Sequence, residues 1–428
     1  MRILLLGINF SPELTGIGKY TGEFAEWLAA RGHEVRVVTA PPYYPQWRVA
    51  DGWLRLWYRT ERRAAAGGGR LTVVRCPLWV PQRPDGLRRV VHLASFMLSS
   101  LPAMLAQVAW RPQVVWVVEP PLGCAPHALL VARLSGARTW LHVQDFEVDA
   151  AFDLGLLRGA RRRAAALRVE RWLMSRFDCV STISARMVER LRAKGVAAQR
   201  ATLFPNWVDL DSITPQPPAW QGGANTWRNR LGLEARHVVA LYSGNMGAKQ
   251  GLDVLGDVAR RLADRDDIIF VLCGQGPARI SLEENCAGLD NVRFLDLQPL
   301  SELNDLLNMA DLHLLPQRAD AADLVMPSKL TGMLASGRPV VAAAHADTAL
   351  AATVRGCGVV VEPEQPAAMA AAIVDLADDA QRRVALGAAA RAHAQARLGR
   401  DAVLRAVERD MQVLCGEADA PEASGEPR

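Results

Sequence analysis

Short apolar runs alternate with longer amphipathic segments in two successive series, and this alternation most constrains the fold of the chain. The runs lie at 3–8, 35–39, 114–118, 139–143 and 179–183 in the first series, and at 238–242, 268–273, 292–295, 311–315, 339–344 and 359–361 in the second. Strands rich in Val, Ile and Leu that are separated by helices form parallel sheets covered on both faces. We therefore predict an α/β protein with two doubly wound, Rossmann-like domains that face a central cleft.

Proline- and glycine-rich sequence without a regular period separates the two series and predicts an interdomain linker. We place an N-terminal domain at 1–210, the linker at 211–234 and a C-terminal domain at 235–390. Alanine- and arginine-rich sequence then predicts a C-terminal helix at 391–415. Small polar residues with prolines predict a disordered tail at 416–428.

Charge and cysteine content exclude several classes of protein. The net charge of the 428-residue chain is only +5, which by itself indicates no nucleic-acid partner. The seven cysteines are odd in number and never spaced as C-x-x-C, so neither a disulfide framework nor a structural zinc site is expected. The first apolar run is short and polar sequence follows it, as in a first strand and not in a secretory signal. These features favour a cytoplasmic protein.

Two segments point to a membrane surface. Six arginines gather between residues 158 and 171, where a solvated helix face is the favoured interpretation and contact with anionic lipid the alternative. The segment 90–110 has no formal charge over 21 residues, but Pro102 and several polar residues dilute its apolar character. We expect a buried or membrane-surface helix there, and hence peripheral attachment to the inner face of the cytoplasmic membrane.

A candidate phosphate site follows the run 311–315, where a polar loop leads into a short helix. Ser328 is a suitable N-cap, Pro327 keeps the preceding chain out of the helix, and Gly337 suits the left-handed position after it. The first turn of a helix exposes unpaired backbone N–H groups at the positive end of the dipole, and Lys329 adds a cation there. The alternative is a capped surface helix with a solvated lysine.

Two further loops of the second series combine glycines with an amide or a cation. They contain Gly244, Asn245, Gly247 and Lys249 after the run 238–242, and Gly274 and Gln275 after the run 268–273. Glycines let the backbone approach an anion closely, and the carboxyl ends of parallel strands meet at one edge of a sheet. The second domain is therefore expected to bind a nucleoside diphosphate, with Lys249 and Lys329 against the pyrophosphate.

The loop after the first strand contains Gly16-Ile17-Gly18 just before a helix expected at 20–30. These glycines come too late for the dinucleotide-binding fingerprint, and no acidic residue ends the second strand, so NAD binding is not expected. A loop that closes on a ligand with its backbone is the favoured interpretation, and an ordinary turn is the alternative.

Acidic residues at other strand ends are candidates for chemistry. Asp145 follows the run 139–143 and is a candidate acid or base, or alternatively the N-cap of the next turn. Glu119 also ends a strand and is expected to contact a substrate, whereas His142 is expected to be a core histidine. The Asp209-Leu210-Asp211 stretch is similar to a metal motif of some sugar transferases, but its place at the linker favours a turn. We predict no metal and no other cofactor.

Together these stretches resemble family 4 of the retaining glycosyltransferases, which have the two-domain GT-B architecture. Within that family they resemble the colanic acid biosynthesis group. The matching stretches lie at 5–13, 15–22, 141–149, 242–247, 273–276 and 326–339, and the resemblance covers residues 1–376.

The resemblance implies transfer of a sugar, with fucose as a candidate, from a GDP- or UDP-linked donor to a polyprenyl-diphosphate-linked glycan in exopolysaccharide assembly. It implies retention of anomeric configuration and no metal. Catalytic roles would fall to Asp145, Lys249 and Lys329. The acceptor and the leaving phosphate would lie beside Gly16, Gly18, Glu119 and Gln144. The donor would lie beside Gly244, Asn245, Gly247, Gly274, Gln275, Asp323, Pro327, Ser328 and Leu330.

The sequence departs from the usual family pattern near the candidate donor helix. Two glutamates eight positions apart are usual there, but the aligned positions hold Leu324 and Gly332, with Asp323 as the nearby acid. Gln144 and Asn245 stand where a histidine and an arginine are usual. This fits a variant subgroup of active enzymes, and the alternative is a non-catalytic homologue that acts as a binding or assembly subunit. A nucleotide-sugar epimerase is disfavoured because its acid and histidine sets are not evident.

Overall fold

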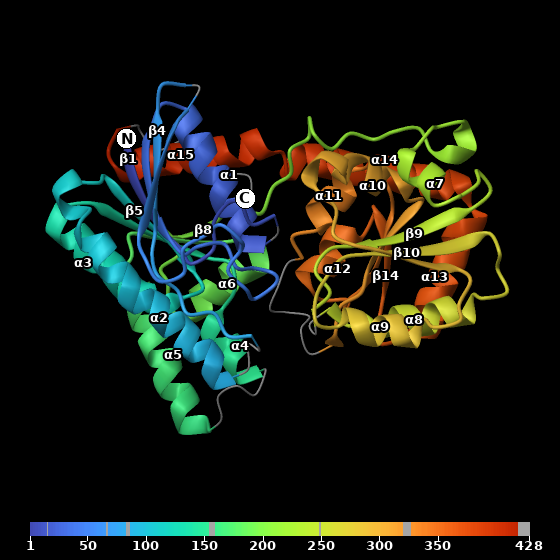
Figure 1. Ribbon diagram of the computed structural model, residues 1–428, viewed down its shortest axis with the longest axis horizontal. Coiled ribbons are helices and arrows are strands. Elements are labelled where there is room, and N and C mark those ends of the chain that lie inside the picture. The colour runs from blue at the N-terminus through green and yellow to red at the C-terminus, as the bar shows by residue number, and fades with distance from the viewer. Residues whose placement is uncertain are drawn as a thin grey trace. The chain divides into compact units, whose positions relative to one another are not determined.

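The computed structural model describes residues 1–14, 16–65, 67–82, 86–153, 159–247, 250–319 and 327–417. The chain forms two compact units, and each is built on one sheet (Figure 1). Unit 1 comprises Met1–Pro205 and the C-terminal segment from Asp401, and unit 2 comprises Asn206–Arg400. The predicted α/β class with two parallel sheets is confirmed.

The sheet of unit 1 has eight strands in the order β3-β4-β2-β1-β5-β6-β7-β8. They are β1 (Arg2–Leu6), β2 (Glu34–Thr39), β3 (Arg59–Ala64), β4 (Arg70–Arg75), β5 (Val114–Glu119), β6 (Arg138–Val143), β7 (Cys179–Thr182) and β8 (Ala201–Leu203). Neighbouring strands pair in parallel except at one edge, where β3 and β4 are antiparallel. Strand β5 is buried along its whole length because helices cover both faces of the sheet.

Helices lie on both faces of this sheet. They are α1 (Gly16–Ala30), α2 (Gly86–Leu105), α3 (Ala125–Ser135), α4 (Glu147–Asp153), α5 (Ala160–Met174), α6 (Ala185–Ala193) and α15 (Arg400–Leu414), with short 3-10 turns at Val108–Trp110 and Leu122–Cys124. Figure 1 shows α1 and α15 on one side of the sheet and α2, α3 and α5 on the other. Leu404, Val407 and Met411 of α15 are buried, so the last helix of the chain completes the core of unit 1.

The sheet of unit 2 has six parallel strands in the order β11-β10-β9-β12-β13-β14. They are β9 (Val238–Ser243), β10 (Ile268–Cys273), β11 (Val292–Leu295), β12 (Leu312–Leu315), β13 (Val340–Ala343) and β14 (Gly358–Val361). Strands β9 and β12 lie side by side although β10 and β11 come between them in the sequence, so the chain reverses its winding direction at this point of the sheet. Ligands of doubly wound sheets bind beyond the carboxyl ends of strands at such a point.

Two hydrophobic layers enclose this sheet. The helices of unit 2 are α7 (Thr226–Arg230), α8 (Asp253–Arg261), α9 (Arg279–Asn285), α10 (Leu303–Met309), α11 (Leu330–Ala335), α12 (Ala349–Val354), α13 (Pro366–Asp378) and α14 (Ala380–Arg397), with 3-10 turns at Ala219–Gln221 and Leu300–Glu302. Figure 1 shows α8, α9 and α13 on one side of the sheet and α10, α11 and α14 on the other. Leu255, Leu282 and Ile373 fill the first layer, and Leu306 and Met333 belong to the second.

The structure differs from the sequence-based expectations at several boundaries. The antiparallel hairpin of β3 and β4 and the short β8 were not expected, because β3 is charged and exposed and β8 has only three residues. Helix α1 begins at Gly16, four residues before the expected start. The expected C-terminal helix at 391–415 is divided between α14 in unit 2 and α15 in unit 1. The expected tail lies outside the described residues from 418 onward.

The segment expected as a linker, 211–234, is part of unit 2 and not a loose connection. Arg228 on α7 is buried and donates hydrogen bonds to the carbonyl oxygen of Met309 over 2.8 Å and to Oδ2 of Asp311 over 3.0 Å. Asp311 in turn accepts from the backbone N–H of Val239 over 2.8 Å. The segment is therefore fastened to β9 and to the start of β12. Asp209 forms the expected turn, since its side chain accepts from the N–H groups of Asp211 and Ser212.

Replacing Arg228 should destabilise unit 2. In Arg228→Leu the buried carboxylate of Asp311 loses its ion pair with Arg228, and breaking such a buried pair costs about 3–5 kcal/mol. Urea denaturation followed by tryptophan fluorescence measures the loss. The matched control is Arg230→Ala two residues away, whose surface ion pair with Glu302 is worth about 1 kcal/mol or less. Equal effects of the two changes would contradict this account.

Candidate functional site

Lys329 lies just before α11 and against the last part of β9. Its Nζ donates a hydrogen bond to the Tyr242 hydroxyl over 2.8 Å and lies 4.0 Å from the centre of the Tyr242 ring. The Tyr242 hydroxyl donates to the carbonyl oxygen of Asn245 over 2.6 Å. Burial lowers the pKa of Lys329 to about 7. In the part of the chain that the structure describes, no carboxylate forms an ion pair with this ammonium, and the half-buried residue keeps a side open to solvent.

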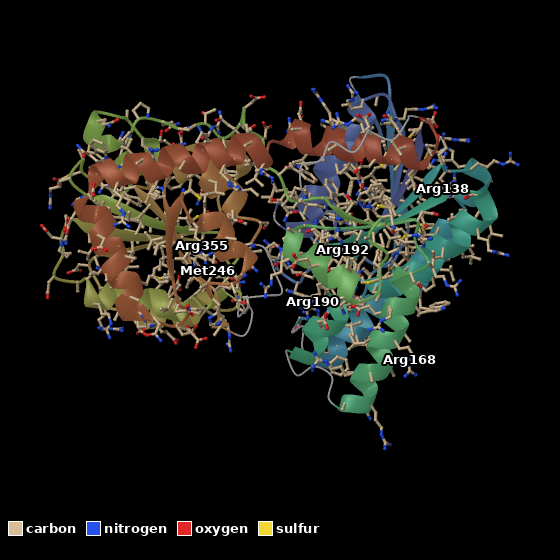
Figure 2. The ribbon with its side chains drawn as sticks, turned by 180° about the vertical axis from the view of Figure 1, so that it is seen from behind. Arg138, Arg168, Arg190, Arg192, Met246 and Arg355 are labelled. Atoms are coloured by element: carbon tan, nitrogen blue, oxygen red, sulfur yellow. The ribbon has the colours of Figure 1, made fainter. Side chains whose placement is uncertain are left out.

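Glycines let the loops after β9 and β10 pack directly on each other. A Cβ atom on Gly274 would lie 1.9 Å from the carbonyl oxygen of Gly244, and one on Gly276 would lie 2.4 Å from that of Met246. The backbone N–H of Met246, labelled in Figure 2, donates to the carbonyl oxygen of Gln275 over 2.8 Å. The predicted glycine-rich loops are thus brought together at one edge of the sheet. Gly244, Gly274 and Gly276 allow the two backbones to approach each other closely.

Part of the predicted donor site lies outside the described residues. This holds for Lys249, Asp323 and Leu324. Asn245 is held next to Lys329 through Tyr242, and Gly247 lies against Gln250, whose Oε1 would be 2.9 Å from an added Cβ. At Gly332, an added Cβ would lie 3.3 Å from Leu307, so the position where the family usually has a glutamate is close to the core.

The candidate phosphate helix is shorter than the sequence suggests. Helix α11 has six residues, its N-cap is Lys329, and no side chain caps it. The prediction that Ser328 is the N-cap is therefore wrong, because Pro327 and Ser328 form a preceding turn in which Leu330 N–H donates to the Pro327 carbonyl oxygen over 3.0 Å. Gly337 has a φ of +68°, which confirms its predicted left-handed position after the helix.

The glycines of unit 1 lie in the first turn of α1 and not in the preceding loop. Gly16 has a φ of +62°, and a Cβ on Gly18 would lie 2.4 Å from Oε2 of Glu13. Glu13 is buried and accepts hydrogen bonds from the backbone N–H groups of Tyr43 and Tyr44, each over 3.0 Å. Burial raises the pKa of Glu13 to about 7, although the two backbone N–H groups act against it. Gly18 therefore makes room for a protein carboxylate.

Asp145 and Gln144 follow β6 but have different surroundings. Asp145 is half-buried. Burial raises the pKa of Tyr44, and the charge of Asp145 raises it further. The side chain of Gln144 is buried, and its Nε2 lies 2.8 Å from Nε2 of His142. His142 Nδ1 lies 2.9 Å from the Ser181 hydroxyl, and burial lowers the pKa of His142 to about 3. The expectation that His142 is a core histidine is confirmed.

Glu119 at the end of β5 is completely buried, which argues against the predicted direct contact with a substrate. Its Oε1 accepts from the backbone N–H of Glu147 over 3.3 Å, and Oε2 of Glu147 accepts from the N–H of Leu122 over 2.7 Å. Burial, and then the charges of Glu147 and Glu170, raise the pKa of Glu119 well above its ordinary value. Glu119 is placed to hold the start of α4.

Arginines of α5 and α6 have contrasting roles. Figure 2 labels Arg190 and Arg192 on α6 and Arg168 on α5. Arg190 pairs with the buried Asp149 over 3.1 Å, whereas Arg192 and Arg168 are exposed. Of the arginine cluster between 158 and 171, every described member is exposed, which agrees with the favoured solvated face.

Sequence reasoning missed Tyr242 and Glu13, which organise the two candidate sites. Tyr242 is the fifth residue of an apolar strand and looked like a core aromatic. Glu13 lies in a loop, where an acidic residue is ordinarily solvated. The available signal was Gly18 five residues later, because a glycine inside the start of a helix indicates close packing by another group.

Metal binding finds no support in the described ranges, where no group of three or more His, Cys, Asp or Glu side chains is placed to hold an ion.

Comparison with known proteins agrees with this arrangement. Residues 15–207 match a glycosyl transferase 4-like domain, and residues 237–379 match glycosyl transferases group 1. The chain is 46% identical over 381 residues to WcaI of Escherichia coli (strain K12), a protein named as a colanic acid biosynthesis glycosyl transferase. That match covers 87% of this chain and 91% of the relative.

Solved structures share the fold at low sequence identity. Sucrose-phosphate synthase from Thermosynechococcus elongatus superposes with a TM-score of 0.74 at 18% identity, over 97% of this chain and 99% of that one. Anabaena Alr3699/HepE in complex with UDP and glucose superposes with a TM-score of 0.67 at 17% identity, over 96% of this chain and all of that one. Both matched domains and the WcaI relationship establish that the chain is a glycosyltransferase of family 4 with the GT-B fold.

Proposed function

We propose that the protein transfers a sugar, with fucose as the candidate, from a GDP- or UDP-linked donor to a polyprenyl-diphosphate-linked glycan. The reaction retains anomeric configuration, uses no metal and serves assembly of an exopolysaccharide of the colanic acid type. The observation that carries the proposal is the Lys329 ammonium, held against Tyr242 at the carboxyl edge of the unit 2 sheet without a carboxylate partner among the described residues. The 46% identity to WcaI supports the pathway, and the UDP complex of Alr3699/HepE supports a nucleotide donor.

Charge neutralisation is the chemical task that this site suits. When the bond between sugar and diphosphate breaks, negative charge develops on the departing nucleoside diphosphate. A cation fixed near the departing diphosphate stabilises the transition state more than the ground state, and this difference is what accelerates the reaction. The ring and hydroxyl of Tyr242 hold the ammonium in place, so little reorganisation is needed when the diphosphate binds.

Removing the Lys329 charge should weaken nucleoside diphosphate binding. Lys329→Ala loses a charge-assisted hydrogen bond, worth about 1.5–3 kcal/mol, so the Kd for GDP or UDP should rise on the order of 10- to 100-fold. Isothermal titration calorimetry measures the change. Arg236→Ala is the matched control, because this exposed cation precedes β9 at the opposite end of the strand. Absence of binding of either nucleotide to the unmodified protein would refute the proposal.

Nucleotide affinity should fall as the pH rises above 7. Burial lowers the pKa of Lys329 to about 7, so the lysine is cationic below this pH and increasingly neutral above it. A diphosphate binds the cationic form, and linkage then weakens binding on the order of tenfold between pH 7 and pH 9. In Lys329→Arg the guanidinium stays charged, so the same titrations should give a nearly constant Kd. A pH profile shared by both proteins would exclude Lys329 as its source.

We further propose that unit 1 attaches to the inner face of the cytoplasmic membrane through α2 and the segment before β3. The region Gly86–Trp110 is long and apolar enough to cross a bilayer, but Phe96 and Met104 bury one face of α2 in unit 1, so a surface position is favoured. On the other face, Leu87 and Leu98 are 77% and 75% exposed. Trp57 is 72% exposed, and the neighbouring Tyr58 hydroxyl donates to the Ser99 carbonyl oxygen of α2 over 2.7 Å.

Charge supports a lipid surface as the partner of this face. Helix α2 contains two arginines in its first turn and no acidic residue. Helix α5, whose arginines are exposed, lies on the same side of the sheet as α2 (Figure 1). Apolar and aromatic side chains with nearby arginines are typical of segments that bind anionic membranes.

Charged substitutions on α2 should reduce membrane binding. Leu87→Glu combined with Leu98→Glu should release the protein from vesicles of phosphatidylglycerol and phosphatidylcholine in a flotation assay, because both side chains would bring carboxylates to the lipid. Leu300→Glu in unit 2, at a side chain that is 50% exposed, should leave flotation unchanged. If the unmodified protein remains unbound at physiological salt, the membrane proposal is wrong.

A further inference from the structure

Glu13 joins two loops at the carboxyl edge of the unit 1 sheet. It lies in the loop between β1 and α1, and its Oε1 accepts from the backbone N–H groups of Tyr43 and Tyr44 in the loop after β2. Its Oε2 accepts from the side-chain amide of Asn9 over 2.9 Å. Both carboxylate oxygens are therefore engaged by groups from different segments, which fixes the distance between the two loops.

Arg75 braces the same loops from the end of β4. It is fully buried, and it donates to the carbonyl oxygen of Ala40 over 3.0 Å and to that of Ser11. Its Nε also donates to Oε1 of Glu61 over 3.1 Å. The loops after β1 and β2 are thus tied together twice, once by a carboxylate through N–H groups and once by a guanidinium through carbonyl oxygens.

Helix α1 is shaped around this contact. A Cβ on Gly18 would lie 2.4 Å from Oε2 of Glu13, and a Cβ on Gly22 would lie 2.6 Å from Cβ of Ser11. Any larger residue at either position would push the helix away from the loop. The sequence therefore keeps two glycines inside the first two turns of a helix, where glycine costs about 1 kcal/mol relative to alanine, so that the loop can approach.

The contacts of Glu13 and Arg75 fix the position of Tyr44. An added Cβ on Gly16 would lie 3.8 Å from Cε1 of Tyr44, so the Tyr44 ring borders the start of α1. The charge of Asp145 acts on the Tyr44 hydroxyl, which places Tyr44 on the same edge as the candidate acid or base. Tyr43 points the other way and packs on His92, with ring centres 4.8 Å apart.

We propose that Glu13 is a positioning residue for sugar transfer, which holds the 43–44 turn so that Tyr44 borders the acceptor between Gly16 and Asp145. This inference rests on the proposed function, since it concerns the acceptor side of the same reaction. Glu13 itself is buried, so we assign it no contact with either substrate. It acts by accepting two backbone hydrogen bonds, and an amide oxygen performs that role as well as a carboxylate does.

Glu13→Ala and Glu13→Gln separate this role from a general effect on folding. Gln keeps an oxygen for the N–H groups of Tyr43 and Tyr44, whereas Ala removes it. Residues 41, 42 and 45 are prolines, so the amide protons between 41 and 45 belong to Tyr43 and Tyr44 alone. Hydrogen exchange followed by mass spectrometry should show faster exchange of this segment in Glu13→Ala and wild-type protection in Glu13→Gln.

The acceptor KM and kcat should also change in Glu13→Ala and stay close to wild type in Glu13→Gln. With a farnesyl-diphosphate-linked glycan as acceptor and the nucleotide sugar that calorimetry selects as donor, Glu13→Ala should raise the acceptor KM or lower kcat by about 10- to 100-fold. In Glu13→Gln both parameters should lie within about threefold of wild type, because the 43–44 turn keeps its position and Tyr44 is not misplaced. The Kd for GDP or UDP should stay unchanged in both variants. Glu26→Ala, on an exposed residue of α1, is the control for the helix.

Thermal unfolding verifies that Glu13→Gln is folded and gives a signature of its own. Burial raises the pKa of Glu13 from 4.5 to about 7, so the stability of the wild type falls as the pH rises through this interval, where the carboxyl ionises in the unfolded chain but keeps its proton in the folded one. Asn9, Tyr43, Tyr44 and Arg75 are the polar and charged groups that act on it. Glu13→Gln carries no charge, and its Tm should therefore exceed that of the wild type at pH 8 by more than at pH 6.

Two results would overturn the inference while leaving the proposed function intact. One is wild-type amide exchange of the 41–45 segment in Glu13→Ala, and the other is wild-type acceptor kinetics in that variant. A mere folding role would lower the Tm and the amount of active protein in Glu13→Ala at unchanged KM. Failure of the unmodified protein to bind GDP and UDP would instead remove the proposed function, and the exchange experiment would still decide what Glu13 holds.

Discussion

The Tyr242 hydroxyl is the contact on which the candidate donor site depends. It accepts a hydrogen bond from Lys329 and donates one to the carbonyl oxygen of Asn245, so one oxygen joins the start of α11 to the loop after β9. The loop after β10 then packs on the loop after β9 because Gly274 and Gly276 have no side chains. The loops after β9 and β10 and the start of α11 are thereby held together at one edge of the sheet. Burial disfavours the charged form of Lys329 at this position, and the pKa of the lysine is therefore lowered.

The two units use buried charge in complementary ways. In unit 2 the Lys329 cation is kept beside the phenol of Tyr242, and the proposed function assigns it the diphosphate of the donor. In unit 1 the Glu13 carboxylate accepts hydrogen bonds from Tyr43, Tyr44 and Asn9 and so fixes a turn. Both groups reduce stability near neutral pH, because burial disfavours their charged forms. Such groups persist where function needs geometry that the most stable sequence would not provide.

Apolar periodicity predicted the central strands because burial on both faces leaves a continuous pattern. The run 268–273 coincides with β10, all six residues of which are buried. The same reasoning could not find β3, since Arg59–Ala64 is a charged edge strand whose pairing depends only on backbone groups. It misplaced the start of α1 because glycine signals a turn, whereas Gly16 is the first residue of the helix and Gly18 lies in the helix to admit Glu13. The linker was misjudged for a similar reason, because Arg228 looks solvated in sequence and is buried in unit 2. The strand-end loops were predictable from topology, but contacts between residues far apart in sequence, such as Lys329 with Tyr242, were not.

Helix α15 gives the chain an unusual order of assembly. The polypeptide leaves unit 1 after Pro205 and comes back to it only at Asp401, and the two connecting segments pair where Val208 N–H donates to the Leu398 carbonyl oxygen over 2.8 Å. Leu404, Val407 and Met411 then cover a face of unit 1 made almost entirely of residues synthesised much earlier. Unit 2, by contrast, is a single continuous stretch. During translation unit 2 can therefore reach its full structure first, while unit 1 keeps an uncovered apolar face until the last part of the chain emerges from the ribosome.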